Sequence, residues 1–330
     1  MSILWCGNED IDFPYSTSWG WSTDNTFYRP VSRGAFQIGG SIEYTLRSAP
    51  FLAGAVTSAW LSFYWYQSAA DSNQPIAGLI DSVSSKGLFI GTSTSGKYGI
   101  FKSDGSFTQI ADESGASLTP NLQKLDLQIN NYGASGTINL FLNGSDTSII
   151  SYTGDTSIAG IANFDSIQFG SCGSSSGAPA FASEVIVADE DTRQFSLQTL
   201  ALTEAGTITE WVNNNYTNIN GAIFSDSNPT SSDAPSQQQQ YNVTNPVAGT
   251  WGIKAVKISA RAAASDGSLA IRFGYNNVGT TVYSSLRSPS TTYTLLETLD
   301  NTDPTNDGAA WEQSEMDTLQ FSVLADVAPS

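Results

Sequence analysis

Acidic side chains are the first candidates for chemistry in this chain, because glycoside hydrolysis uses a pair of carboxylates. A retaining enzyme needs the two groups roughly 5–5.5 Å apart, and alternation along a strand places residues i and i+2 on one face. The run Glu9-Asp10-Ile11-Asp12 has the wrong spacing and sits at the terminus. Asp189-Glu190-Asp191 falls at an expected domain junction, and Glu184 is the one acid in a hydrophobic stretch. The sequence therefore predicts no enzyme and no catalytic residue.

The chain contains no histidine, which removes the commonest general base. Serine–histidine and cysteine–histidine nucleophile pairs are excluded with it, as are histidine-containing metal sites. The two cysteines, Cys6 and Cys172, lack the spacing of a zinc motif and cannot form a disulfide framework. Two interpretations stay open: two separate buried thiols, or one bridge if the first and last strands of a sandwich are neighbours.

Calcium is the metal for which the sequence offers ligands, because calcium prefers carboxylate and amide oxygens. The candidate ligands are Asp10, Asp12, Asp24 and Asn25. No loop has the spacing of an EF-hand. The alternative is that these residues are solvated turn residues, and on that interpretation the protein has neither a metal nor another cofactor.

Carbohydrate recognition usually needs an exposed aromatic platform flanked by polar side chains that bond sugar hydroxyls. Trp19, Trp21 and Tyr132 are the candidates for such a platform. Tyr132 lies in the polar stretch NNYGAS, which favours an exposed loop. The alternative for each ring is burial in the core, which is the expectation for Trp60 and Trp65.

The charge balance narrows the possible partners. The net charge is −18, from 31 acidic and 13 basic residues, and the basic residues form no cluster. Nucleic acid and anionic membrane surfaces both require clustered Lys and Arg, so neither is an expected partner. The acidity itself favours solubility through self-repulsion. The first residues lack the basic and apolar regions of a signal peptide, and no apolar run approaches the ~18 residues of a membrane span. These features predict synthesis in a cytoplasm without membrane insertion.

Alternating apolar residues organise the centre of the chain at residues 122–144. Leu125, Leu127 and Ile129 share one strand face, and the intervening polar residues, among them Asp126, are expected on a wet face. A Gly- and Asn-rich turn then leads to a second alternating strand, which ends at Asn143-Gly144. The pattern predicts two adjacent antiparallel strands and a tight turn into a third.

Further strands recur about every ten residues, a spacing typical of a β-sandwich. Residues 60–66, WLSFYWY, are apolar on both faces, which indicates a central strand covered on both sides. Other strands of the first domain are expected at residues 87–91, 98–101, 107–110, 164–169 and 181–188. The charged run at residues 189–194 predicts a boundary between domain 1–190 and domain 191–330.

The second domain is also expected to be mostly β. A strand is predicted at residues 195–202, and the polar low-complexity stretch 225–240 is expected to be a long surface loop. One short helix is predicted in EQSEMDTL, at residues 312–319. The remaining strands are expected at residues 256–260, 269–273, 282–283, 293–299 and 319–323.

The strand order of residues 3–188 resembles the concanavalin A-like, laminin-G-like jelly roll. The resemblance is carried by WLSFYWY, by INLFLNG after a glycine-containing turn, and by the late strand Ile167-Gln168-Phe169-Gly170. A second resemblance covers both domains. LWCGNEDIDF at 4–13, SEVIVADEDTRQFSLQTL at 183–200 and DPTNDGAAWEQSEMDTLQFSV at 303–323 resemble tailed-bacteriophage virion structural proteins. The glutamine run at 237–240 departs from the common pattern of that family.

The resemblance implies a non-enzymatic virion protein, made in the host cytoplasm, that presents a lectin-like domain. A tail fibre, tip or adsorption component is the leading expectation, and a head fibre or capsid decoration protein is the alternative. A glycan-binding host-recognition module is a third interpretation. The expected partners are other virion proteins, further copies of the chain and a host surface glycan. Phe195, Leu197 and Trp311 are the expected assembly contacts.

Overall fold

The fold is all-β and divides into two compact units, residues 1–197 and 198–330. The division follows Leu197, later in the chain than the expected boundary at residue 190. The computed structural model describes residues 2–9, 12–15, 20–29, 31–38, 45–67, 74–111, 115, 119–170, 180–213, 216–219, 226, 229–249, 251–265 and 269–327.

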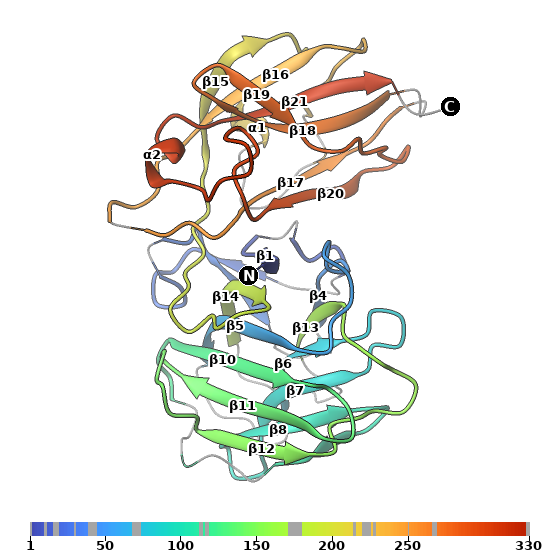
Figure 1. Ribbon diagram of the computed structural model, residues 1–330, viewed down its shortest axis with the longest axis vertical. Coiled ribbons are helices and arrows are strands. Elements are labelled where there is room, and N and C mark those ends of the chain that lie inside the picture. The colour runs from blue at the N-terminus through green and yellow to red at the C-terminus, as the bar shows by residue number, and fades with distance from the viewer. Residues whose placement is uncertain are drawn as a thin grey trace. The chain divides into compact units, whose positions relative to one another are not determined.

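The first unit is a jelly-roll sandwich of two antiparallel sheets (Figure 1). The larger sheet has eight strands in the order β12-β11-β10-β5-β14-β3-β2, and β1 also pairs with β14. Their bounds are β1 Ile3–Gly7, β2 Gly20–Ser22, β3 Ala35–Ile38, β5 Ala59–Gln67, β10 Gln123–Asn130, β11 Gly136–Leu142, β12 Ile150–Gly154 and β14 Ala180–Ala188. The first and last strands of the sandwich are therefore neighbours.

The smaller sheet has six strands in the order β4-β13-β6-β7-β8-β9. Their bounds are β4 Thr45–Arg47, β6 Gln74–Ile80, β7 Gly87–Thr92, β8 Tyr98–Ser103, β9 Phe107–Gln109 and β13 Ser166–Gly170. The expected meander through residues 87–110 is confirmed by the consecutive pairing of β7, β8 and β9.

The centre of the large sheet follows the sequence pattern closely. β10 pairs with β11 from Leu125 opposite Leu142 to Asn130 opposite Thr137, as the alternation predicts. Asn143 and Gly144 have φ values of 55° and 71°, so both adopt the left-handed conformation that a tight Asn-Gly turn requires. β5 lies between β10 and β14, which confirms that WLSFYWY is a central strand.

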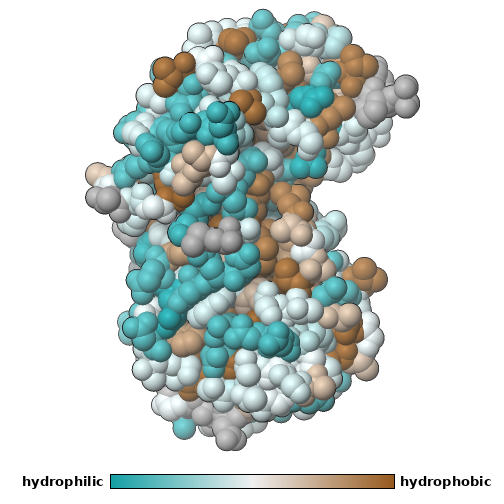
Figure 2. Space-filling model, in the orientation of Figure 1, coloured by the Kyte–Doolittle hydropathy of each residue, from teal (hydrophilic) through white to brown (hydrophobic). Residues whose placement is uncertain are grey.

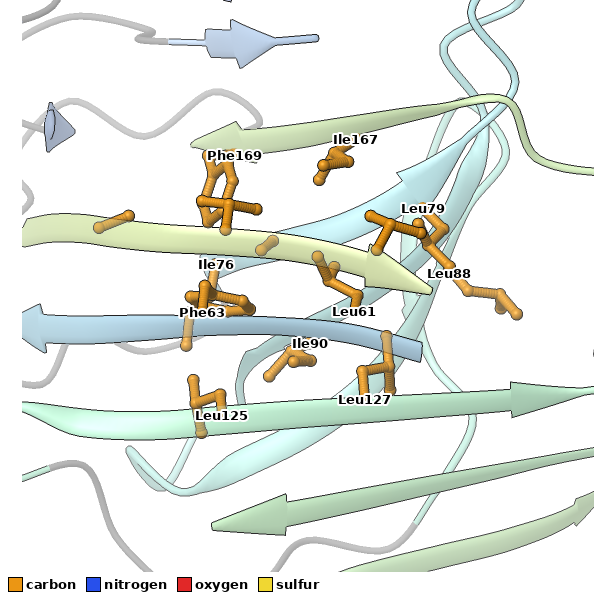
Figure 3. Packing of buried hydrophobic residues seen from close by; sticks show 14 of the residues in the cluster. Leu61, Phe63, Ile76, Leu79, Leu88, Ile90, Leu125, Leu127, Ile167 and Phe169 are labelled. Atoms are coloured by element: carbon orange, nitrogen blue, oxygen red, sulfur yellow. The ribbon is translucent and has the colours of Figure 1, made fainter. Parts of the chain in front are cut away.

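The core of the first unit lies between its two sheets. Figure 3 shows Leu61 and Leu127 of the large sheet with Ile90 and Ile167 of the small sheet in one packed cluster. These four side chains are at most 1% exposed. Full burial of each such side chain contributes roughly 1.5–3 kcal/mol, so this layer holds the two sheets together.

The second unit contains a five-stranded antiparallel sheet, ordered β15-β16-β21-β18-β19, and the separate pair β17-β20 (Figure 1). Their bounds are β15 Leu202–Thr209, β16 Gln238–Val243, β17 Val256–Ala262, β18 Leu269–Asn277, β19 Thr280–Tyr283, β20 Thr294–Asp300 and β21 Gln320–Val327. The predicted short helix is confirmed as α2, Gln313–Met316, and a further short helix, α1, spans Tyr216–Ile219.

Two expectations for this part of the chain are wrong. The strand expected at residues 195–202 is absent: residues 195–201 are irregular, and β15 begins at Leu202. The glutamine run was expected in a surface loop, but Gln239 and Gln240 lie in β16 and are 0% exposed. Pairing with β21 on one side and β15 on the other satisfies the backbone of β16, which outweighs the low strand propensity of glutamine.

Polar residues make up most of the surface of each unit on the face drawn in Figure 2, with hydrophobic residues scattered among them. In the described ranges, no helix has the length and apolar character needed to cross a membrane.

Candidate functional site

A group of charged side chains in the first unit lies on the side of the large sheet that faces away from the core. Lys124 and Asp126 lie on this side, opposite Tyr64 and Ser62 across the β5–β10 ladder. Residues 191–197 pass over them, and we call this stretch the covering segment and the sheet surface beneath it the covered face. Asp126 was expected on a wet face, but it is 0% exposed. That expectation is wrong because a segment distant in sequence excludes water from the polar side of β10.

Lys124 is the main attachment point of the covering segment. Its Nζ donates hydrogen bonds to the backbone carbonyls of Thr192, Arg193 and Phe195 at 2.8, 2.8 and 3.0 Å. The same Nζ lies 3.6 Å from Asp126 Oδ1, which also accepts a 3.3 Å hydrogen bond from the Thr192 hydroxyl. One ammonium group therefore fixes the path of the irregular backbone from residue 192 to residue 195.

Glu184 holds the end of the same segment. It sits at an irregularity in the β5–β14 pairing with φ of 51°, and this distortion re-aims its side chain. Arg29 donates two hydrogen bonds of 2.9 Å to the Glu184 carboxylate, from Nε to Oε1 and from Nη2 to Oε2. The Leu197 N–H and the Ser196 hydroxyl also donate to Oε2, each at 3.3 Å. Both carboxylate oxygens are thus occupied by partners from this chain.

Burial shifts the ionisation of these groups toward their neutral forms. It raises the pKa of Glu184 against the opposing effect of Arg29, and it raises the pKa of Asp126 against the effect of Lys124. Burial also lowers the pKa of Lys124, which Asp126 counteracts. Each acid keeps its own base within hydrogen-bonding or ion-pair distance, so the cluster pairs its charges internally. A general acid or nucleophile needs a carboxylate that can reach substrate, and Glu184 is fully engaged.

Aromatic rings beside this cluster are covered as well. Trp60 and Phe141 stack with centroids 5.5 Å apart, and the Arg193 guanidinium lies 4.7 Å from the Phe141 centroid. Arg193 also bonds Asp191 and the Ser145 carbonyl. The covering segment therefore occupies both the charged and the aromatic parts of the covered face.

The predicted glycan residues are not brought together by the fold. Tyr132 lies in the β10–β11 loop, where its hydroxyl accepts a 2.7 Å hydrogen bond from the Ile158 N–H and its ring packs edge-on against Phe164. Trp21 lies in β2, at the opposite edge of the large sheet, and packs against Phe36. Trp19 falls outside the described residues. Tyr132 and Trp21 are both half-buried, and a sugar-binding role for these rings stays a prediction.

The calcium candidates have local partners. Both the Asn8 and Glu9 N–H groups donate to Asp12 Oδ2, at 2.8 and 3.0 Å. The Thr26 N–H donates to Asp24 Oδ1 at 2.9 Å, which closes a short turn. Asp10 lies outside the described residues. Within the part of the chain that the structure describes, no three His, Cys, Asp or Glu side chains gather as a metal site would require.

Glu9 lies beside Asp12 in this N-terminal segment, close to the irregularity at Glu184. The Asn8 side-chain oxygen accepts a 2.7 Å hydrogen bond from the Glu184 N–H. Burial raises the pKa of Glu9 to about 7, although Arg33 lies 3.2 Å from its carboxylate. Glu9 therefore titrates close to neutral pH.

Of the expected assembly residues, Trp311 is buried in its unit, and Phe195 and Leu197 are half-buried. The Phe195 carbonyl accepts from Lys124, and the Leu197 N–H donates to Glu184, so both residues fasten the covering segment. Trp311 is 3% exposed, packs edge-on against Tyr275 and donates to the Asp300 carbonyl at 2.9 Å. Their role in assembly stays a prediction.

Cys6 lies in β1 opposite Ile186 of β14 and is buried. Cys172 falls outside the described residues, so the two interpretations of the cysteines both stay open.

A second group of buried polar side chains crosses the sheet of the second unit. Gln240 of β16 stands opposite Ser322 of β21, and Gly274 of β18 lies between Ser322 and Tyr283 of β19; we call Gln240, Ser322 and Tyr283 the polar row. The described residues offer no hydrogen-bond partner to the Gln240 amide or to the Ser322 and Tyr283 hydroxyls. The row thus contrasts with Lys124 and Glu184 of the covered face, where only Asp126 Oδ2 and the hydroxyls of the neighbouring serines lack a partner among the described residues.

An exposed aromatic residue of the first unit, Tyr15, was not among the residues predicted from the sequence. Tyr15 follows Pro14 in a polar stretch and is 54% exposed, and the Arg47 guanidinium lies 5.2 Å from its ring centroid. Exposed Leu52 and Val83 belong to neighbouring loops. We call Tyr15, Arg47, Leu52 and Val83 the rim patch. A tyrosine after proline in a polar run is the one signal that could have indicated it.

Comparison with known proteins adds solved structures only, since no protein-family model and no curated protein matches the chain. Domain 4 of AbnA, an extracellular arabinanase from Geobacillus stearothermophilus, is 10% identical and has a TM-score of 0.37, covering 56% of this chain and 80% of its own. The carbohydrate-binding module CBM66 from Bacillus subtilis is 11% identical with a TM-score of 0.34, covering 52% and 96%. The receptor-binding domain of botulinum neurotoxin type G is 10% identical with a TM-score of 0.33, covering 86% and 79%. At these scores and identities, the likenesses carry no argument about ligand or activity.

Proposed function

We propose that this chain is a non-enzymatic structural protein of a tailed-bacteriophage virion that displays a lectin-like jelly roll. The resemblance that motivates the proposal includes residues 183–200, and this stretch contains Glu184 and the covering segment. The observation that carries it is the covered face, where the protein's own chain occupies the charged and aromatic surface of the large sheet.

A segment fixed over the sheet surface fits a domain that is displayed on a particle better than an enzyme that must bind and release substrate. Three carbonyls bonded to Lys124 and two donors bonded to Glu184 fix residues 192–197 up to the last residue of the first unit. A hydrolase would instead need open carboxylates beside a substrate cleft. The fixed segment gives the jelly roll a defined exit point for the chain, as a displayed domain requires.

The location of the protein on the particle distinguishes a tail component from a head component. We favour a tail fibre, tip or adsorption component, and a head fibre or capsid decoration protein is the second candidate. Immunogold labelling of intact particles with an antibody against this chain tests both. Gold at the tail supports the first and gold over the capsid the second, whereas no gold on any particle rejects a virion role.

Absence of catalysis is tested separately. Purified full-length protein is incubated with host-surface polysaccharides, and release of reducing ends is measured. We expect none. Cleavage that Glu184→Gln abolishes, with the fold retained by circular dichroism, would contradict the non-enzymatic assignment and reopen the hydrolase interpretation.

A further inference from the structure

The rim patch combines an exposed aromatic ring with an arginine whose hydrogen-bonding capacity is only partly used. The Arg47 Nη1 donates to the Ser85 hydroxyl at 2.8 Å and to the Ser82 carbonyl at 3.3 Å. In the described ranges no hydrogen bond or ion pair engages the Arg47 Nε or Nη2. Their N–H groups form the edge that recognises carboxylates in a bidentate manner.

Several segments hold the patch together. The Tyr15 N–H donates to the Arg47 carbonyl at 3.4 Å, which places the ring beside β4. Asp165 accepts from both the N–H and the hydroxyl of Ser82 at 2.7 Å, and its own carbonyl accepts from the Phe51 N–H at 2.6 Å. These bonds bring the loops that carry Val83 and Leu52 to the same end of the sandwich. The patch is therefore a preorganised surface, not a chance exposure of single side chains.

The Arg47 guanidinium lies 5.2 Å from the Tyr15 ring centroid, and Tyr15 as a whole is 54% exposed, so aromatic surface stays accessible beside the guanidinium. An open tyrosine face stacks on the C–H groups of a sugar ring, because it offers apolar area at little cost in side-chain entropy. Leu52 and Val83, 46% and 91% exposed, are further exposed apolar residues on the two loops that bond to Asp165.

Charge selects the type of sugar. The chain carries a net charge of −18, so an anionic ligand is repelled by most of its surface. Arg47 is a local exception, and its open fork matches a carboxylate in geometry. Neutral sugars would leave that fork without a partner.

We propose that the rim patch binds a carboxylate-bearing sugar, with its ring on Tyr15 and its carboxylate on the Arg47 Nε–Nη2 edge. The inference rests on the proposed function, because it names the ligand class of the displayed domain. Uronic acids and sialic acids share this chemistry. A single shallow contact is weak, and display in several copies would raise the avidity.

The test is a glycan array probed with the full chain, carrying neutral, uronic-acid and sialic-acid glycans. Binding should be confined to the acidic glycans, and the array shows which of the two acids is the source. Tyr15→Ala and Arg47→Gln should each weaken binding by about tenfold or more, as removal of a central contact does. Arg47→Lys should also weaken it, because lysine keeps the charge and loses the fork.

Two controls separate binding from folding. Tyr15→Phe retains the ring and should bind like the wild type, and Trp251→Ala removes an exposed aromatic of the second unit without effect on binding. Every variant should keep the wild-type melting temperature. Equal binding of neutral glycans, binding unaffected by Tyr15→Ala and Arg47→Gln, or no glycan bound would each overturn the inference.

Failure of the two proposals is distinguishable. Gold-labelled particles combined with an empty array would overturn the sugar site and leave the virion role. Specific binding of acidic glycans without labelled particles would support the sugar site and reject the virion role.

Discussion

The covered face of the first unit and the polar row of the second unit both contain buried polar side chains on a β-sheet. They differ in how many of these side chains have hydrogen-bond partners. On the covered face, Lys124 and Glu184 bond to backbone groups and bases that are distant in sequence. In the polar row, the Gln240 amide and the Ser322 hydroxyl are equally buried and find no partner among the described residues.

The difference shows what buried polarity can specify. A buried group costs free energy unless it is hydrogen-bonded, so the bonds of Lys124 favour one path of the covering segment over all others. An unpartnered amide favours no particular arrangement and only adds its desolvation cost. The covered face is therefore expected to be sensitive to the loss of any partner, and the polar row to tolerate apolar replacement.

Lys124→Met should have the largest effect. It leaves Asp126 buried without its base and removes the donor from three carbonyls, which we expect to lower the free energy of unfolding by about 3–5 kcal/mol. Urea denaturation measures the loss, and hydrogen exchange of residues 191–197 should rise with it. Lys97→Met is the matched control, because no interaction of the Lys97 ammonium was found in the described structure.

A double-mutant cycle sharpens this result. Lys124→Met combined with Asp126→Leu removes both charges, so the double variant should recover part of the loss caused by Lys124→Met alone. Strict additivity would mean that the ion pair is not what holds the covering segment.

The next largest effect should be a dependence of the free energy of unfolding on pH, which we expect to arise in the first unit. Glu9 holds its proton in the folded state up to about pH 7 but releases it near pH 4.5 when unfolded. Its contribution is therefore fully present below about pH 4.5 and is lost as the pH rises to about 7, amounting to about 3 kcal/mol.

Glu9→Gln should remove this fall in the free energy of unfolding between about pH 4.5 and pH 7. The measurement is the difference in unfolding free energy between wild type and variant at intervals from pH 4.5 to 8, which cancels the titration of other groups. Within the polar row, Tyr283 has its pKa raised by burial, so that row should not titrate over the same range. An identical slope in Glu9→Gln would contradict the assignment.

Ser196→Ala should have a smaller effect on the covered face. The hydroxyl contacts both Arg29 and Glu184, and its loss should cost about 1–2 kcal/mol, as for a hydrogen bond to a charged group. Ser145→Ala, a change in an exposed turn, is the control. Equal stability of the two variants would show that Glu184 needs only Arg29.

Gln240→Met should have the smallest effect and the opposite sign. Methionine has a similar shape and carries no amide to desolvate, so the free energy of unfolding should rise by about 1 kcal/mol. Thermal and urea unfolding both measure it. A decrease would show that the amide is paired, for example with ordered water, and the contrast between the two regions would fail.

Much of the fold could be predicted from local patterns because those patterns act over a few residues. The alternation of apolar and polar residues predicted β10 and β11, and the Asn143-Gly144 pair predicted the turn that follows β11. Apolar residues on both faces predicted that β5 is a central strand. The short helix α2 and the final strand β21 were found in the same way.

The site was predicted less well, because its residues act at a distance. Nothing in the spacing of Lys124 and Glu184 indicates that both hold the covering segment, and in the sequence Glu184 is only a solitary acid in a hydrophobic stretch. Tyr15 was missed because its neighbour in the fold, Arg47, is 32 residues away in the sequence.

The sequence by itself determined that the chain is β, where most strands run, and that histidine chemistry is absent. These are properties of composition and of a two-residue period. Only the tertiary structure decided that Asp126 is shielded from solvent, that Gln240 lies in a buried strand and that residues 195–201 are irregular. The physical reason is that alternation separates the two faces of a strand, whereas solvent exposure of a face depends on which distant segment comes to cover it.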